Sequence, residues 1–122
     1  MNEVNAVLII DDSRVSRLMV KAILKQKYPE ATLYEAGNAE ETLALEISDD
    51  LSHIICDFNM PGMDGIELSS ELQKRYPDAI ITLLTANIQA SIRNKAEDKG
   101  IYFAKKPVTE ERIISILKKE KK

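Results

Sequence analysis

The sequence contains few of the residues that cross-link small folds or bind transition metals. Its 122 residues include one cysteine, one histidine and no tryptophan. Cys56 has no partner for an internal disulfide, so we interpret it as a buried, inert thiol in a fold held by its 44% hydrophobic residues. His53 lacks the several histidine and cysteine partners of a transition-metal site, and we interpret it as structural or exposed.

Long apolar segments and a strong charge bias are also missing. No stretch approaches the ~18 apolar residues of a membrane helix, and the first five residues lack the basic start of a signal peptide. The 17 basic and 20 acidic residues give a net charge of −3, which argues against a general nucleic-acid binder and against disorder. We therefore expect a folded cytoplasmic protein that binds neither nucleic acid nor membrane directly.

What the sequence does contain is a regular alternation of short apolar runs and longer amphipathic stretches. The apolar runs predict strands at 6–10, 31–35, 52–56, 79–84 and 101–104. The amphipathic stretches predict helices at 13–27, 38–47, 66–75, 87–99 and 109–119. Over residues 1–122, with no linker or repeat, this alternation predicts one α/β domain whose parallel sheet has helices on both faces.

Local signals predict where these helices end and which face is buried. Pro29 and Pro77 end the first and third helices, because the residue before a proline is driven out of helical geometry. Gly100 is a natural C-terminal cap for the fourth helix. In the first helix, the spacing of Leu18 and Met19 predicts that both belong to the core.

Polar residues directly follow four of the five apolar runs. They are, in chain order, Asp11 and Asp12 after the first, Asp57 after the third, Thr85 after the fourth, and Lys105 and Lys106 after the fifth. The carboxyl ends of parallel strands lie at one edge of a sheet, where ligands bind in α/β folds. We therefore expect these side chains to converge on one small volume.

Such a group of residues has a definite chemistry. Two carboxylates ~5 Å apart at an effective dielectric near 20 repel by about 3 kcal/mol, so the cluster needs a proton, a lysine or a divalent cation. Oxygen ligands alone favour Mg²⁺, Mn²⁺ or Ca²⁺. Lys106 and Thr85 add a cation and a hydroxyl suited to a phosphoryl group, and Asp57 is the candidate nucleophile for phosphorus.

These residues resemble a known family. Asp11-Asp12, Asp57, Thr85-Ala86 and Lys106-Pro107, in that order, together with the segment 57–65, are similar to the receiver domain of two-component response regulators, of the single-domain chemotaxis-regulator type. The resemblance covers essentially the whole chain. It implies a flavodoxin-like doubly wound (βα)5 fold with the strand order 2-1-3-4-5.

The resemblance also implies roles for the residues of the site. Asp57 would accept a phosphoryl group from the phosphohistidine of a histidine kinase or phosphotransfer protein. The side chains of Asp12 and Asp57 and the carbonyl of Asn59 would bind Mg²⁺ or Mn²⁺, with Asp11 acting partly through water. Thr85 and Lys106 would hold the phosphoryl oxygens, and the Lys106–Pro107 bond would be cis.

A switch and an output surface are implied as well. Phe103, in place of the tyrosine of many chemotaxis regulators, would turn inward as Thr85 moves toward the phosphate. The fourth helix, fifth strand and fifth helix would then bind a downstream protein. Asn59 and Asn87 would set the lifetime of the phosphate. The protein would not be an enzyme beyond weak self-phosphorylation and self-dephosphorylation, and would act in chemotaxis or another two-component phosphorelay.

Other interpretations remain open at this stage. Asp11 and Asp12 are also typical helix caps, Lys106 could be a surface lysine, and Phe103 a packing residue. A phosphatase using the same aspartyl phosphate would need an acid where Asn59 stands. A structural module that has lost phosphorylation is the third alternative. The chain is compatible with a whole protein and with a receiver cut from a longer regulator.

Overall fold

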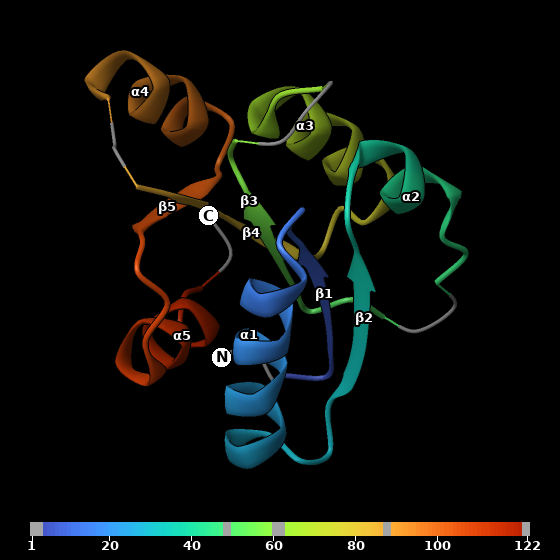
Figure 1. The fold of residues 1–122 in the computed structure, drawn as a ribbon. Helices are drawn as coiled ribbons and strands as arrows, with labels where there is room; N and C mark the ends of the chain where they lie inside the picture. The colour runs from blue at the N-terminus through green and yellow to red at the C-terminus, as the bar shows by residue number, and fades with distance from the viewer. Residues whose placement is uncertain (1–3, 48–49, 60–62, 87–88, 121–122) are drawn as a thin grey trace.

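The fold is a five-stranded parallel sheet between two layers of helices (Figure 1). A computed structural model describes residues 4–47, 50–59, 63–86 and 89–120. The strands are β1 Ala6–Ile10, β2 Thr32–Ala36, β3 His53–Asp57, β4 Ile80–Thr85 and β5 Tyr102–Lys105. The helices are α1 Arg14–Lys27, α2 Ala39–Ala44, α3 Gly65–Arg75, α4 Ala90–Asp98 and α5 Glu110–Leu117. The observed strand order, β2-β1-β3-β4-β5, confirms the expected doubly wound α/β fold.

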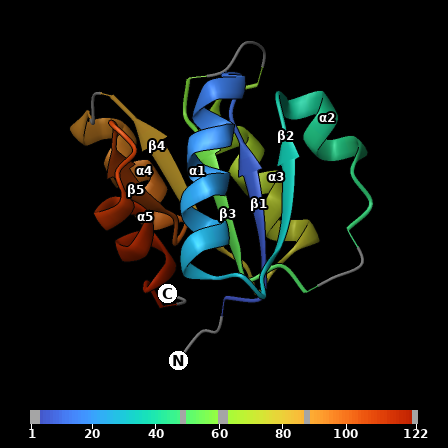
Figure 2. The same ribbon diagram turned by 60° about the horizontal axis from the view of Figure 1, so that its bottom comes forward.

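Two groups of buried side chains, one on each face of the sheet, form the core. In β1, Val7 and Ile9 pack with α1 and α5, whereas Leu8 and Ile10 pack with α2, α3 and α4. Figure 2 shows α1 and α5 on the near side of the sheet and α3 behind it. All five residues of β1 and of β3 are buried, as expected for central strands covered on both faces.

The helix ends follow the local sequence signals. Tyr28 and Tyr76, each before a proline, leave helical geometry, and their N–H groups donate to the carbonyls of Leu24 and Leu72. Gly100 has a φ of 77°, which closes α4 in the left-handed conformation that favours glycine. In the described ranges, no helix is long and apolar enough to cross a bilayer.

The predicted buried face of α1 is wrong. Val20 and Leu24 are buried there, whereas Leu18 and Met19 are 51% and 49% exposed. Helical spacing groups residues into a face but does not decide which face meets the sheet, and α1 buries the face that carries Val20 and Leu24. Val15, 66% exposed, extends the same apolar surface toward the start of α1.

Two other helices differ from the pattern. The helix expected at 38–47 ends at Ala44, and the extended backbone of Leu45 follows it. Leu45 and Ile47 both pack against the core, which residues two apart achieve in an extended chain but not on one helix face. The helix expected at 87–99 is observed from Ala90, and residues 87–88 lie outside the described residues.

Candidate functional site

The structure brings four charged residues together at the carboxyl edge of the sheet. Carboxylate oxygens of Asp11, Asp12 and Asp57 all lie within 4.8 Å of one another. The Lys106 ammonium lies 3.4 Å from Oδ1 of Asp57 and 3.8 Å from Oδ2 of Asp11. Asp11 and Asp12 follow β1, Asp57 ends β3, and Lys106 follows β5, so the doubly wound topology creates the group.

Asp57 is fixed by its pairing with β4 and by the backbone that follows it. It is the last residue of β3, one position later than the predicted strand, and it is only 4% exposed. The N–H of Phe58 donates to the carbonyl of Leu84 at 2.9 Å, which extends the sheet pairing past Asp57. The N–H of Asn59 donates to Oδ1 of Asp57 at 3.2 Å. The carboxylate is therefore held in one orientation facing Lys106.

Asp11 and Asp12 lie in the turn between β1 and α1, and Ser13 is the cap of α1. The Ser13 hydroxyl accepts the N–H of Ser16, while Oδ1 of Asp11 accepts the N–H of Ser13 at 2.9 Å. Helix capping therefore does not account for either acid. Asp11 is buried and Asp12 is exposed, so the cluster has one open side.

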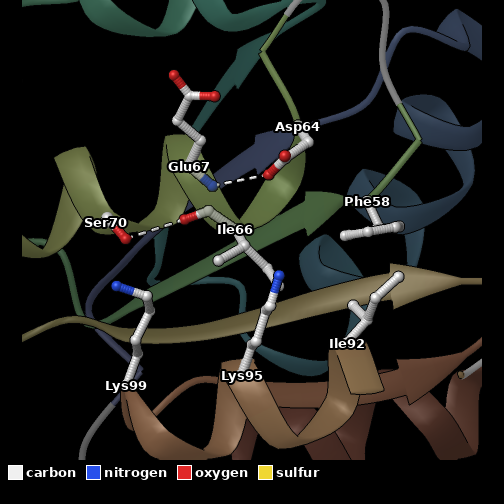
Figure 3. A pocket seen from close by; sticks show the side chains of 8 residues that line it. All are labelled: Phe58, Asp64, Ile66, Glu67, Ser70, Ile92, Lys95 and Lys99. Carbon is white, nitrogen blue, oxygen red and sulfur yellow. Dashed lines mark hydrogen bonds between the residues drawn. The ribbon is translucent and has the colours of Figure 1, made fainter. Parts of the chain in front are cut away.

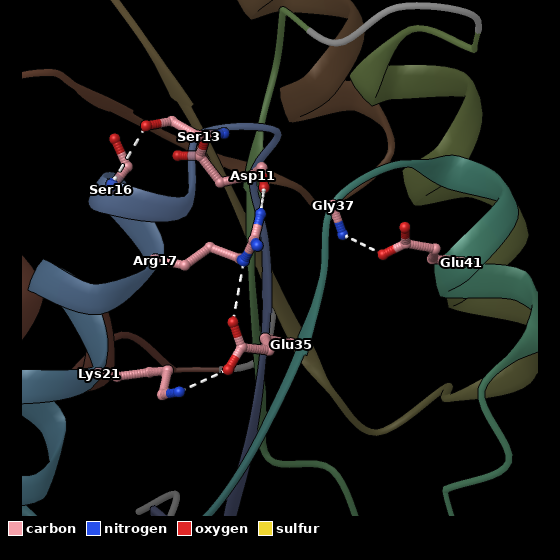
Figure 4. Close-up of polar contacts among 8 residues, drawn as sticks. All are labelled: Asp11, Ser13, Ser16, Arg17, Lys21, Glu35, Gly37 and Glu41. Atoms are coloured by element: carbon pink, nitrogen blue, oxygen red, sulfur yellow. Dashed lines mark hydrogen bonds and ion pairs between the residues drawn. The ribbon is translucent and has the colours of Figure 1, made fainter.

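A second polar group supports this turn and was not found from the sequence. Arg17 donates from its guanidinium to the carbonyl of Asp11 and from Nε to Glu35 on β2 at 2.9 Å (Figure 4). Lys21 pairs with the other oxygen of Glu35. Lys21 and Arg17 together hold the pKa of Glu35 below its usual value. Arg17 reads as an ordinary polar position of an amphipathic helix, so spacing gives no sign of this contact.

Burial raises the pKa of Asp57. Loss of solvent raises its pKa above the ordinary value, and the negative charge of Asp11 acts in the same direction. Lys106 and the Asn59 N–H oppose the increase. The neighbouring thiol of Cys56 is fully buried, which raises its pKa and keeps it protonated, as expected for an inert cysteine.

Thr85 and Lys106 belong to the same edge. Thr85 is the last residue of β4, is buried, and is paired in register with Lys105. Its carbonyl accepts the N–H of Lys106 at 2.8 Å. The Lys106–Pro107 peptide bond is cis. Lys105 itself is exposed, and Lys106 is the lysine that faces the carboxylates.

The aromatic residues flank the site on the side of α3 and α4. The ring of Phe103 lies 5.9 Å from the ring of Phe58, centroid to centroid, at an interplanar angle of 59°. Phe103 is half-buried against the core, and Phe58 directly follows Asp57. Asn59 is exposed beside Asp57. Asn87, the other residue expected to tune hydrolysis, lies outside the described residues.

The donor set fits a hard divalent cation. Three carboxylates and one ammonium leave a formal charge of −2 at the site, which a divalent cation would balance. Histidine and cysteine do not contribute to this cluster in the described ranges, and oxygen ligands suit Mg²⁺ or Mn²⁺. The exposed carboxylate of Asp12 leaves an approach from solvent.

Comparison with known proteins identifies the family. The model of the response regulator receiver domain matches residues 7–118. The chain belongs to the response regulator receiver family. Receiver domains are signalling phosphoacceptors of two-component systems, act with histidine kinases and downstream effectors, and generally bind Mg²⁺ in an acidic pocket.

Relatives of known sequence are longer than this receiver. It is 36% identical over 109 residues to the two-component response regulator ORR6 of Oryza sativa subsp. japonica, and 29% identical over 105 residues to the cyclic di-GMP phosphodiesterase response regulator RpfG of Xanthomonas campestris pv. campestris. Each match covers 84% of the receiver. The receiver spans 62% of ORR6 and 28% of RpfG, so the matches concern one part of those proteins.

Solved structures show the same architecture. The Vibrio cholerae chemotaxis protein CheY4 has a TM-score of 0.80 at 27% identity, over 94% of this receiver and 97% of that chain. A structure described as an adenylate cyclase from Rhodopirellula baltica has a TM-score of 0.82 at 26% identity, over 96% of this receiver and 85% of that chain. These similarities confirm the flavodoxin-like fold of the receiver.

Proposed function

We propose that Asp57 of this receiver accepts a phosphoryl group from the phosphohistidine of a histidine kinase or phosphotransfer protein. The observation that carries the proposal is the geometry around Asp57. A buried, oriented carboxylate faces an ammonium at 3.4 Å and stands beside two further carboxylates. A nucleophile, a cation for the transferred oxygens and ligands for a metal are therefore within one small volume.

The transfer makes one bond and breaks one. An oxygen of Asp57 attacks phosphorus, the phosphorus–nitrogen bond of the donor breaks, and its electron pair returns to the imidazole ring. Lys106 stabilises charge on the phosphoryl oxygens, and the hydroxyl of Thr85 donates to one of them. The side chains of Asp12 and Asp57, the carbonyl of Asn59 and, through water, Asp11 would hold Mg²⁺, which lowers the repulsion between phosphate and carboxylates.

The same proposal covers the lifetime of the phosphate. Asn59 is exposed next to Asp57, and its side chain is proposed to border the approach of an attacking water. Asn87, two residues after Thr85, is proposed to border the other side. The activity of the chain is then limited to slow phosphorylation by small donors and slow hydrolysis, in keeping with a signalling role in the cytoplasm.

The output is proposed to be a change of surface. Thr85 ends β4, and movement of this residue toward a phosphate would vacate space that Phe103 can enter. Phe103 lies on β5, between α4 and α5 in the chain, so its rotation would change the face formed by these three elements. We propose that this face binds a downstream protein in chemotaxis or another two-component phosphorelay.

The phosphodonor is proposed to dock on α1. Val15, Leu18 and Met19 expose an apolar surface on the helix that begins two residues after Asp12. Exposed apolar patches beside a reactive site are typical of protein–protein contacts. Leu18→Ser should slow phosphorylation by a phosphotransfer protein and leave phosphorylation by acetyl phosphate unchanged. If a phosphotransfer protein phosphorylates the wild type and Leu18→Ser at equal rates, the proposed docking on α1 is wrong.

The central experiment is phosphorylation by a small donor. The receiver is incubated with Mg²⁺ and acetyl phosphate, and its intact mass is measured by electrospray. We expect one added phosphoryl group in the wild type, loss of the signal in Asp57→Ala, and loss after chelation of Mg²⁺. Asp64→Ala is the matched control, since Asp64 is an exposed carboxylate that caps α3. A modification that persists in Asp57→Ala would overturn the proposal.

The alternatives have distinguishable outcomes in the same assay. A phosphatase would turn over small phosphoesters continuously, which the side chain at position 59 disfavours because an amide cannot act as general acid. A module without phosphorylation would bind its partner equally well as wild type and as Asp57→Asn, with or without Mg²⁺. The buried charge at Asp57 argues against this second alternative, because a structural role gives no reason to keep it.

A further inference from the structure

A cavity lined by Phe58 lies between α3 and α4. Its volume is about 370 Å³, within the range of small-molecule sites. Phe58, Ile66 and Ile92 form its apolar lining, and Lys95 of α4 and Lys99, which directly follows α4, line one side (Figure 3). Gln73 of α3 donates to the carbonyl of Lys99 at 2.6 Å, which links α3 to the end of α4 beside the cavity.

The charges around the cavity are separated. Among the residues that the structure describes, neither Lys95 nor Lys99 is in an ion pair. Asp64 accepts the backbone N–H of Glu67 at 2.8 Å, and the Glu67 side chain extends away from the two lysines (Figure 3). Asp64 and Glu67 also line the cavity, but on the side of α3, whereas Lys95 and Lys99 line the opposite side. The two ammonium groups therefore form a separate positive side next to the apolar surface.

The cavity is in contact with the phosphorylation site through one residue. Phe58 directly follows Asp57, lines the cavity, and contacts the ring of Phe103. Gly65, the first residue of α3, packs closely against the backbone of Phe58, since a Cβ on Gly65 would lie 3.0 Å from the Phe58 Cα. This contact limits the movement of Phe58. A molecule packed on the Phe58 ring would therefore restrain the segment that carries Asp57.

We propose that the α3–α4 cavity binds a small organic anion with an apolar or aromatic body, and that this binding is coupled to phosphorylation through Phe58. The apolar body packs on Phe58, Ile66 and Ile92, and the acidic group pairs with Lys95 and Lys99. The coupling rests on the proposed function of Asp57, whereas the binding does not. Coupling is reciprocal, so the phosphorylated and unphosphorylated receiver differ in affinity for the anion.

The probe for binding is 1-anilinonaphthalene-8-sulfonate, which combines two aromatic groups with one sulfonate. We expect saturable fluorescence enhancement with the wild type, and affinity weaker by about tenfold in Lys95→Gln/Lys99→Gln. Both lysines are exposed, and a thermal melt checks that the variant is folded. Ile92→Ser tests the apolar wall and should weaken binding similarly.

Two controls locate the dye. Lys25→Gln/Lys118→Gln removes two exposed lysines elsewhere and should leave the affinity unchanged. Leu18→Ser removes part of the exposed apolar surface that Val15, Leu18 and Met19 form on α1, to which the dye could also bind, and should leave the affinity unchanged. Unchanged affinity in Lys95→Gln/Lys99→Gln, or loss of binding in Leu18→Ser, would overturn the proposed site.

Coupling is measured by repeating the titration with beryllofluoride and Mg²⁺. We expect the dye affinity to change by at least about fivefold in the wild type and not in Asp57→Ala. If ¹⁹F NMR shows beryllofluoride bound and the affinity is unchanged, the coupling is wrong and the proposed function stands. If neither beryllofluoride nor acetyl phosphate modifies the receiver while Lys95 and Lys99 still govern dye binding, the proposed function fails and the cavity site stands.

Discussion

At the scale of single residues, the site depends on placing charge where the fold would otherwise place apolar atoms. Asp57 ends a strand whose other residues are all buried, and it is itself 4% exposed. Lys106 and the N–H of Asn59 offset part of the unfavourable burial. The remaining imbalance appears as a raised pKa, which is typical of residues kept for function.

The raised pKa of Asp57 predicts how Mg²⁺ binding depends on pH. Mg²⁺ binds the ionised carboxylate, so protons compete with it below the Asp57 pKa, which burial raises above the ordinary 3.8. As pH falls, the Mg²⁺ affinity should therefore begin to decline at a higher pH than an ordinary carboxylate would allow, eventually by about tenfold per pH unit. Calorimetric titration between pH 8 and pH 4 measures this, and a constant affinity down to pH 4 would contradict the raised pKa.

A second prediction at this scale concerns Arg17. The guanidinium connects the carbonyl of Asp11 to Glu35 on β2, so Arg17→Gln should loosen the turn that carries Asp11 and Asp12. We expect Mg²⁺ to bind roughly five times more weakly, with a stability loss of about 1 kcal/mol. Mg²⁺ titration and urea unfolding measure the two effects.

Two variants separate positioning from general destabilisation. Arg17→Lys keeps the charge and one donor group, and should restore part of the Mg²⁺ affinity. Lys21→Gln removes only an exposed ion pair with Glu35, so it should change stability by at most about 0.5 kcal/mol and leave the affinity unchanged. Equal loss of Mg²⁺ binding in Arg17→Gln and Lys21→Gln would show that Arg17 has no specific role.

At the scale of elements, the close contact between the end of β3 and the start of α3 controls the position of Phe58. Gly65 begins α3 and is buried, and a Cβ there would lie 3.0 Å from the Cα of Phe58 and 3.1 Å from a methyl group of Leu83. Backbone atoms cannot move aside as a flexible side chain can. Glycine at this position is therefore required by the approach of one element to another.

Substitution of this glycine gives the third prediction. Gly65→Ala should destabilise the receiver by about 2 kcal/mol, because Phe58 and Leu83 must shift. Gly37→Ala is the matched control, since its Cβ would meet only the ends of Arg17 and Glu41 side chains at 3.4 Å. That variant should stay within about 0.5 kcal/mol of the wild type in urea unfolding. If Gly65→Ala and Gly37→Ala are equally stable, the close approach of Gly65 to Phe58 does not limit substitution at position 65.

At the scale of the whole molecule, the acidic cluster opposes folding in the absence of a cation. Asp57 is far in the sequence from the adjacent Asp11 and Asp12, and its carboxylate comes within 4.8 Å of theirs only in the folded state. A carboxyl group whose pKa is raised by folding destabilises the protein increasingly as pH rises above its unfolded value. At neutral pH the fold therefore carries this unfavourable term in full.

Removal of one charge tests this balance. Asp57→Asn should stabilise the metal-free receiver at pH 7 by about 1 kcal/mol, or roughly 4 °C in the unfolding midpoint. Mg²⁺ should raise the midpoint of the wild type, and raise that of Asp57→Asn much less, because a ligand is lost. Differential scanning calorimetry with and without Mg²⁺ measures both, and an Asp57→Asn protein less stable than wild type would contradict the electrostatic argument.

The order of strands and helices along the chain could be predicted from the sequence alone, because apolar periodicity and the signals at Pro29, Pro77 and Gly100 act locally. It also indicated which residues follow the strands. The strand ends were misplaced by one residue at Asp57 and Thr85, since pairing with a neighbouring strand decides where a strand stops. The strand order came from resemblance to a family, not from periodicity.

The contacts between elements depend on packing in three dimensions and could not be predicted from the sequence. The docking of α1 turned Leu18 and Met19 outward, although their spacing fits a buried face equally well. The same docking placed Arg17 against the carbonyl of Asp11, a backbone partner that sequence spacing does not show. The cavity beside Phe58 depends on the separation of α3 and α4. Periodicity specifies a face within an element, whereas the distance and angle between elements come from packing the whole core.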